Sequence, residues 1–192
     1  VGVEFNGLYY HSDKFKVPRY HYDKYESAQA SGIRLIQVWE DDWESRRSVV
    51  EEHLRQVVGK STLSKINARD TEAILVPSHQ AKQFLEAYHI QGYVGSSVQV
   101  GLKHEGCLVA VACFKLRGED YELVRYATSA NVRGGHSKIV AHFERTHTYQ
   151  TLITFADRTF SDGGLYSKTG WVKDRIIRAD YSYVVGGKRH HK

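Results

Sequence analysis

The strongest constraint on the fold is an apolar segment at residues 33–39, which reads Ile-Arg-Leu-Ile-Gln-Val-Trp. A short apolar run of this kind predicts a buried β-strand. The residues from Arg19 to Ser31 have helical spacing, with Pro18 suited to the helix start and Gly32 to its end. Before this helix, residues 3–6 alternate between apolar and polar, which predicts an earlier strand. A strand, a crossover helix and a second strand predict a right-handed βαβ unit with parallel strands.

The first of these strands carries candidate functional residues. Glu4 and Asn6 are two positions apart, so their side chains project from the same face, and His11 follows a few residues later. A carboxylate, an amide and an imidazole can together hold a hard divalent cation and move a proton. On the helix that follows, His21 and Lys24 share one face and could oppose phosphate charge. The alternative is an edge strand and a crossover helix whose polar faces are only solvated.

Acidic residues follow the buried strand directly, at Glu40, Asp41 and Asp42. Ligands gather at the carboxyl ends of strands in sheets of this type. Acidic residues also suit a helix N-terminus, so Asp41 and Asp42 are equally explained as helix-capping residues, and Glu40 is a weaker metal candidate. The helix from here to Val58 has an apolar stripe, and its arginines lie outside that stripe. They could contact DNA, or they form an ordinary solvated face.

The overall composition points to a polyanionic partner. The 192 residues carry a formal net charge of +5, and the isoelectric point is about 9.1. Such a balance favours nucleic acid, although a basic surface can also be without a partner. The sequence contains no apolar run long enough to span a membrane and nothing that resembles a signal peptide, which predicts a cytoplasmic protein with no membrane association.

Residues 59–70 have the composition of a linker and contain the basic residues Lys60, Lys65 and Arg69. A second unit then begins near Thr71. Its pattern predicts a helix from Ser78, a hairpin of residues 98–102 and 107–116, a strand at 121–127, a helix at 139–145, a strand at 151–156, a short helix at 161–168 and a last strand at 180–185. The turn at Gly134 and Gly135 precedes a helix, and free amides at a helix start attract anions.

The segments "GVEFNGLYYHS" and "RYHYDKYESAQASGIRLIQVWEDDW" resemble the nuclease core of phage homing endonucleases related to very-short-patch-repair nickases, in the restriction-endonuclease-like superfamily. The resemblance implies a nuclease that cuts or nicks DNA with a divalent metal such as Mg²⁺. Glu4 and Asn6 would bind the metal, His11 would act as general base or acid, and Lys24 and His21 would oppose phosphate charge. The expected compartment is the cytoplasm of a phage-infected bacterial host.

Relatives in this group carry a metal-binding aspartate on a strand roughly a dozen residues before the glutamate, and the present sequence begins too late to include it. The resemblance therefore implies a truncated core, completed by a separate N-terminal chain or segment. Some members of the group also have a tail similar to "FLEAYHIQGYVGSS" and "FADRTFSDGGLYSKTGW", which extends the resemblance over nearly the whole chain.

The second unit resembles the acetyltransferase-like (GNAT-like) fold. "VRGGHSKIV" stands where that family places its pyrophosphate-binding turn, and "GGLYSKTGW" resembles a further family motif. The turn lacks the usual R/Q-x-x-G-x-G/A spacing, from which we expect that coenzyme A does not bind.

Together these patterns predict a chain of mixed class, α/β and α+β. Residues 1–58 would form a truncated restriction-endonuclease-like βαβα core, 59–70 a basic linker and 71–192 an acetyltransferase-like domain. The predicted function is magnesium-dependent cleavage of double-stranded DNA. The two alternatives are a decayed nucleic-acid- or protein-binding module and an acyl-CoA-dependent N-acyltransferase. The predicted DNA contacts are Arg19, Arg46, Arg47, Lys60, Lys65, Arg69, Arg133, His136 and Lys138.

Overall fold

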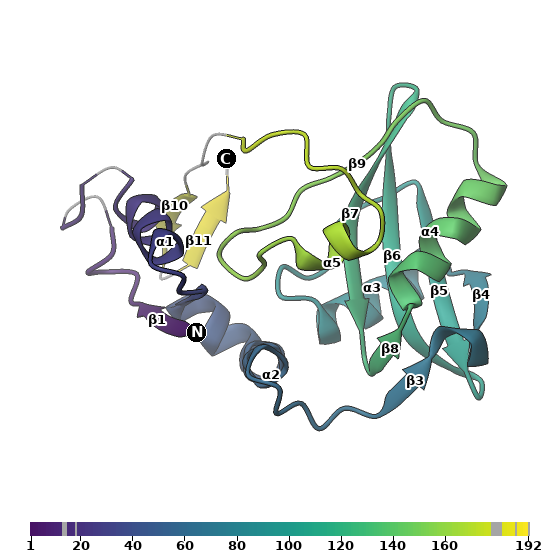
Figure 1. Cartoon of the computed structure of the whole chain (residues 1–192), viewed down its shortest axis with the longest axis horizontal. Coiled ribbons are helices and arrows are strands. Elements are labelled where there is room, and N and C mark those ends of the chain that lie inside the picture. Colours follow the sequence, from purple (N-terminus) through teal and green to yellow (C-terminus); the bar gives the residue numbers. More distant parts are fainter. Residues whose placement is uncertain (13–14, 18, 178–181, 187, 192) are drawn as a thin grey trace. The chain divides into compact units, whose positions relative to one another are not determined.

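The computed structural model describes residues 1–12, 15–17, 19–177, 182–186 and 188–191. The chain divides into two compact units (Figure 1). Unit 1 comprises Val1–Val58 with Ala156–Lys192, and unit 2 comprises Gly59–Phe155. The residues after 155 thus cluster with the N-terminal part of the chain. The predicted domain bounds of 1–58, 59–70 and 71–192 stay a prediction.

Unit 1 is built on a two-stranded parallel sheet. Strand β1 (Gly2–Asn6) is followed by helix α1 (Tyr20–Ala30), strand β2 (Leu35–Trp39) and helix α2 (Glu40–Val57). The strands pair in parallel, with Glu4 opposite Gln37. This is the predicted βαβα order, while membership of the restriction-endonuclease-like class is not shown. Helix α5 (Gly164–Lys168) and the hairpin of β10 (Ser182–Val185) and β11 (Lys188–His191) complete the unit.

On β1 the polar side chains are buried and the apolar side chains are exposed, which is the reverse of an ordinary amphipathic strand. Val3 and Phe5 are 55% and 53% exposed, whereas the polar Asn6 is fully buried and Glu4 is half-buried. Glu4 and Asn6 share a face, as their spacing predicts, and that face points into unit 1. The alternative of a solvated polar face is therefore wrong for this strand.

Strand β2 is closed on its other side by the loop that precedes α5. The backbone amide of Gln37 donates to the Thr159 carbonyl at 3.0 Å. The Phe160 carbonyl lies 3.0 Å from the His53 imidazole on α2, and burial lowers the pKa of His53, so that this ring is neutral near pH 7. The loop from the C-terminal region thus adds backbone contacts to a sheet that would be marginal with two strands alone.

Unit 2 contains a five-stranded mixed sheet in the order β4-β5-β6-β7-β9. The strands are β4 (Glu72–Leu75), β5 (Val98–His104), β6 (Cys107–Arg117), β7 (Asp120–Thr128) and β9 (Leu152–Thr154). Neighbouring strands are antiparallel except for the parallel pair β7 and β9. Helices α3 (Ser78–Tyr88) and α4 (Gly135–Thr146) pack on the sheet. The chain is therefore of mixed α and β class with a mixed sheet, as the sequence predicts.

The core of unit 2 forms where these helices meet the sheet. On α3, the buried Phe84 and Leu85 pack against Val111 and Cys113 of β6. On α4, the ring of Phe143 stacks on Phe114 with centroids 3.9 Å apart. Each buried side chain of this size contributes roughly 1.5–3 kcal/mol to stability, so these contacts fix both helices against the sheet.

The predicted linker contains structure that its sequence does not signal. Residues Lys65–Asn67 form strand β3, Ala68–Asp70 form a short 3₁₀ helix, and β3 pairs in parallel with β8 (Asn131–Arg133). A strand of three residues is too short to give a recognisable alternation. None of the described helices is long and apolar enough to cross a membrane.

Candidate functional site

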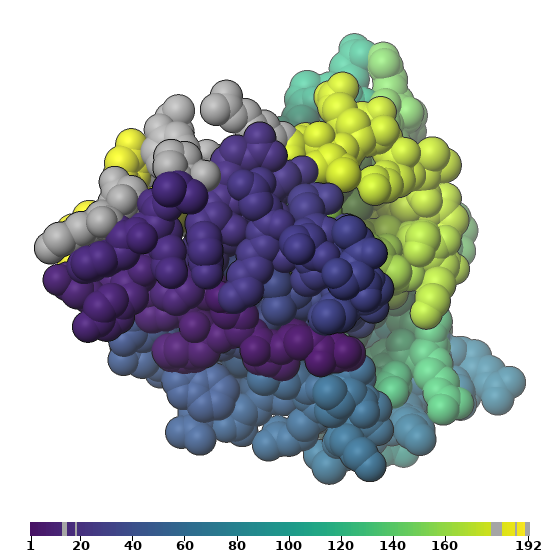
Figure 2. All heavy atoms as spheres, turned by 60° about the vertical axis from the view of Figure 1, so that its left-hand side comes forward, coloured from purple at the N-terminus to yellow at the C-terminus, as the bar shows by residue number. Residues whose placement is uncertain are grey.

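The four residues predicted to be catalytic in unit 1 do come together. The ammonium of Lys24 on α1 lies 2.5 Å from a carboxylate oxygen of Glu4 on β1. The rings of His11 and His21 stack with centroids 5.1 Å apart, and His21 lies 4.7 Å from the ring of Trp39. Figure 2 shows the N-terminal residues and α1 side by side on one face of this unit.

The charge state of this cluster does not suit the predicted roles. Burial lowers the pKa of both His11 and His21, with the charge of Glu4 opposing the shift in each case. The hydrogen bond from Lys24 to Glu4 raises the pKa of Lys24, so the ammonium is kept charged and is engaged by this carboxylate. Neutral imidazoles and a compensated ammonium supply little positive charge for a phosphate group.

The residues predicted to bind magnesium have other partners, which corrects that prediction. The Glu4 carboxylate is bonded to an ammonium, and the side-chain amide of Asn6 donates to that of Gln37 at 3.2 Å. A hard dication requires six or more oxygen ligands, most of them carboxylates, carbonyls or waters. Over the ranges that the structure describes, no three His, Cys, Asp or Glu side chains are grouped so that they could hold a metal ion.

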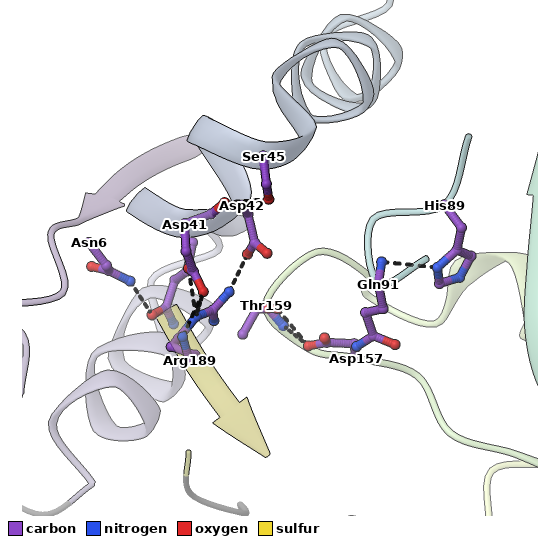
Figure 3. A network of polar contacts seen from close by, with 10 residues as sticks. Asn6, Asp41, Asp42, Ser45, His89, Gln91, Asp157, Thr159 and Arg189 are labelled. Atoms are coloured by element: carbon purple, nitrogen blue, oxygen red, sulfur yellow. Dashed lines mark hydrogen bonds and ion pairs between the residues drawn. The ribbon is translucent and has the colours of Figure 1, made fainter. Parts of the chain in front are cut away.

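The acidic residues after β2 have structural partners (Figure 3). Glu40 accepts a bond from the Leu8 backbone amide at 2.7 Å. The guanidinium of Arg189 on β11 donates to Asp41 at 2.8 Å and to Asp42 at 2.5 Å, and it lies over the ring of Trp39. Burial raises the pKa of Asp42, and Arg189 opposes the rise. These acids anchor the C-terminal hairpin at the start of α2.

Several residues predicted to contact DNA are held within their own unit. Arg19 pairs with Asp23 at 3.6 Å, Arg47 pairs with Glu51 at 2.8 Å, and Arg46 lies at a kink in α2. Lys138 donates to the backbone carbonyls of Ala68, at 2.7 Å, and of Thr71. Burial lowers the pKa of His136 to about 4, so this ring carries no charge at neutral pH.

The remaining predicted contacts are exposed and lie mostly near the start of α4. Lys60, Lys65, Arg69 and Arg133 are exposed, and the pairing of β3 with β8 sets Asn67 opposite Arg133. The methyl group of Ala68, next to Arg69, would lie 3.6 Å from a Cβ at Gly134. Arg69 and Arg133 therefore belong to the chain segments next to the turn into α4.

In unit 2, the edge of β7 opens part-way along the strand. Tyr121, Glu122 and Leu123 pair with β9, and the pairing ends at Leu123 opposite Thr154. The register of β7 with β6 shifts at this same point, where Cys113 lies opposite Arg125 and Phe114 opposite Leu123. A bulge bends a strand and increases its twist. Val124 is the extra residue of the bulge, and from Arg125 to Thr128 β7 pairs with β6 but not with β9.

The open part of β7 is followed, after the short strand β8, by the start of α4. Gly134 precedes the helix with φ of +75°, a conformation that favours glycine. A Cβ at Gly135 would lie 2.9 Å from a methyl group of Val132 and 3.2 Å from the Tyr126 hydroxyl, so the turn is tightly packed. The first helical bond of this turn runs from Lys138 to the Gly134 carbonyl at 3.0 Å. The N-terminus of a helix attracts anions.

Comparison with known proteins gives distant structural similarity. No protein-family model matches the sequence, and no curated protein matches it. An integron cassette protein from the mobile metagenome of V. cholerae is similar in structure, with 14% identity over 62% of this chain and 94% of that one, at a TM-score of 0.45. A ribosomal-protein-alanine N-acetyltransferase from Brucella melitensis biovar Abortus has 16% identity over 60% of this chain and 97% of its own, at a TM-score of 0.42.

The contacts within unit 1 correct the predicted function. The residues expected to hold magnesium are bonded to Lys24 and to Gln37 instead. The prediction of a magnesium-dependent phage-type endonuclease or nickase is therefore contradicted.

Proposed function

We propose that unit 2 is an acyl-CoA-dependent N-acyltransferase. The observation that carries the proposal is the open edge of β7, from Val124 to Thr128, which leads within a few residues into the N-terminus of α4. A ligand with an extended amide-containing arm and a pyrophosphate group fits both features at once, and acyl-CoA has this construction.

The arm of the ligand would bind as an added strand. The pantetheine part of coenzyme A contains two amides, which can form hydrogen bonds with backbone groups along the edge of β7 beyond its pairing with β9. Its pyrophosphate would then meet the N-terminus of α4, where the helix dipole favours negative charge. Arg133 and Arg69, both exposed, would add positive charge for the phosphates.

This proposal replaces the expectation that coenzyme A does not bind. That expectation rested on the spacing of the residues around Gly134 and Gly135. Backbone amides bind phosphate irrespective of side-chain identity. The turn at Gly134 and Gly135 lacks the basic residue of the usual R/Q-x-x-G-x-G/A motif. Arg69 can supply this charge, since the pairing of β3 with β8 brings the segment after β3 to the turn.

The chemistry requires little from individual side chains. The thioester carbonyl would lie along the open part of β7, where a backbone amide can stabilise the negative charge that develops on its oxygen. Exclusion of water by the strand and the bound arm would favour attack by an amine over hydrolysis.

Calorimetric titration with acetyl-CoA tests the proposal. Ser137 is exposed in the first turn of α4, so Ser137→Glu places a negative charge where the pyrophosphate would bind. A negative charge at a helix N-terminus does not destabilise the helix. We expect saturable binding by the wild type and binding weaker by about tenfold or more in the variant, since each 1.4 kcal/mol corresponds to tenfold.

Two control variants make the result specific. Ser137→Gln has a similar size without the charge and should bind as the wild type does. Gln80→Glu adds the same charge to the first turn of α3, where Gln80 is exposed, and should also have no effect. The proposal fails if the wild type shows no saturable binding, or if Gln80→Glu weakens binding as much as Ser137→Glu.

A further inference from the structure

A groove lies in unit 2 between the β6–β7 turn and the segment that connects α4 to β9. Its volume is about 380 Å³. The two chain segments that form it can be followed in Figure 1. The lining residues are Leu116, Gly118, Glu119, Tyr121, Thr148, Tyr149 and Gln150.

Hydrogen bonds between the two walls of the groove hold them in place. The side-chain amide of Gln150 donates to the Glu119 carboxylate, and the Gln150 backbone amide donates to the Glu119 carbonyl at 3.3 Å. Next to them, the Thr151 amide donates to the Asp120 carboxylate at 2.8 Å, and the Tyr121 amide donates to the Thr151 carbonyl at 3.0 Å. Because these bonds already exist, a ligand does not have to order the walls, which lowers the cost of binding.

Two tyrosine rings line the groove at a steep mutual angle. The rings of Tyr121 and Tyr149 have centroids 6.4 Å apart and planes at 76°. Phe143 supports both from behind, at 5.0 Å and 5.8 Å. The Tyr149 hydroxyl donates to Glu144 at 3.2 Å, which fixes this ring. Aromatic rings set at an angle to each other provide the faces that attract an organic cation.

The charge of the groove is complementary to a cation. Glu119 is the acidic residue in the lining, and no lysine or arginine is among the lining residues. The nearest arginine along the turn, Arg117, is paired with Glu122 at 2.8 Å. Lys115 and Arg145 lie on the adjoining elements but outside the groove. An ammonium group in the groove would therefore lie near one carboxylate and two aromatic rings.

We propose that this groove binds the alkylammonium group of a primary amine, which is the acceptor of the acyl group. The role of this amine as acyl acceptor rests on the proposed function. Tyr121 lines the groove, and Leu123, two residues along β7, is where the pairing with β9 ends and the open edge begins. Two residues of strand span about 7 Å, so an amine that enters from the groove approaches the position proposed for the thioester.

The transfer that this arrangement serves is balanced without a further reactant. The ammonium releases one proton to solvent, and the free amine attacks the thioester carbonyl. A C–N bond forms, the C–S bond breaks, and the second proton on nitrogen passes to the departing thiolate. The products are an amide and free coenzyme A.

The groove is tested first without coenzyme A. The probe is Nα-acetyl-lysine methylamide, titrated by NMR and compared with its neutral Nα,Nε-diacetyl analogue. We expect the charged probe to shift the resonances of residues 116–121 and 148–150, and the neutral probe to bind at least about fivefold more weakly. Glu119→Gln retains an acceptor for Gln150 but loses the charge, and should weaken binding of the charged probe about five- to tenfold. Glu105→Gln removes an exposed carboxylate in the β5–β6 turn and should change nothing.

Equal binding of the two probes, or equal binding by wild type and Glu119→Gln, overturns the amine site. A second measurement follows release of free thiol from acetyl-CoA with the same amine. If the amine binds through Glu119 but acetyl-CoA does not bind, the proposed function and the acceptor role are wrong while the amine site stands. If acetyl-CoA binds but the charged probe does not, the amine site is wrong and the proposed function stands.

Discussion

Lys138 gives the sharpest distinction between a structural and a ligand-binding role. Its ammonium donates to the carbonyls of Ala68 and Thr71, which join the segment after β3 to the first turn of α4. Hydrogen bonds to a charged group contribute about 1.5–3 kcal/mol each. The Ala68 carbonyl also accepts bonds from the Thr71 amide at 3.1 Å and the Thr71 hydroxyl at 2.6 Å, so it remains bonded without the lysine.

The main loss in Lys138→Met is therefore at the carbonyl of Thr71, a buried residue. Methionine has a similar length and fills the same space. With a small additional loss at Ala68, we expect the free energy of opening in this region to fall by about 2–4 kcal/mol. That corresponds to amide hydrogen exchange that is roughly 30- to 900-fold faster.

Hydrogen exchange followed by mass spectrometry measures this effect directly on peptides that cover residues 65–75 and 131–140. It is preferable to tryptophan fluorescence, because Trp39, Trp43 and Trp171 all belong to unit 1. The control is Lys65→Met, which removes the same charge from an exposed side chain and should leave exchange unchanged. The reasoning is refuted if Lys138→Met exchanges like the wild type, or if both variants weaken salt-dependent binding of double-stranded DNA equally.

Three further outcomes are expected. Arg189→Ala should destabilise unit 1 by about 2–4 kcal/mol, because it leaves Asp41 and Asp42 without their guanidinium partner. Arg189→Lys should destabilise it less. Urea unfolding followed by the fluorescence of Trp39, which lies under the guanidinium, measures both. Gly101→Ala places a Cβ 2.5 Å from a Val76 methyl group and should cost about 1–3 kcal/mol, and the added change Val76→Ala should recover part of that loss in thermal unfolding. His136 has a folded-state pKa of about 4 against 6.5 when unfolded, so the unfolded state binds the proton more readily. Its contribution to stability is complete above pH 6.5 and is lost as the pH falls towards 4, by about 3 kcal/mol in all. Exchange measured at pH 7 and pH 5 should show the loss, and His136→Gln should reduce it.

The helices and longer strands could be predicted because their signals are local. The predicted helix from Arg19 to Ser31 is α1, Tyr20–Ala30, and the predicted hairpin is present with slightly longer strands. The predicted start of α4 at Ile139 is four residues late. Glycines at 134 and 135 indicate a loop by composition, whereas Gly134 adopts the left-handed conformation just before the helix and Gly135 begins it.

The site could be predicted less well, because its contacts are long-range. The sequence brings Glu4, His11, His21 and Lys24 to one place correctly, yet it does not reveal that the lysine neutralises the glutamate. Lys138 stands beside two glycines and suggests a phosphate ligand, but its partners are carbonyls 67 and 70 residues away. The open edge of β7 depends on where the pairing with β9 stops, and a three-residue strand such as β9 carries no signal for that point.

The orientation of β1 has a consequence for how substitutions should be interpreted in this chain. In most strands, an apolar position is the sensitive one and a polar position accepts almost any residue. In β1 the reverse holds, since Val3 and Phe5 face outward while Asn6 is buried. A randomised library of residues 2–6 should retain charged residues freely at positions 3 and 5 and should recover few viable clones that differ at position 6.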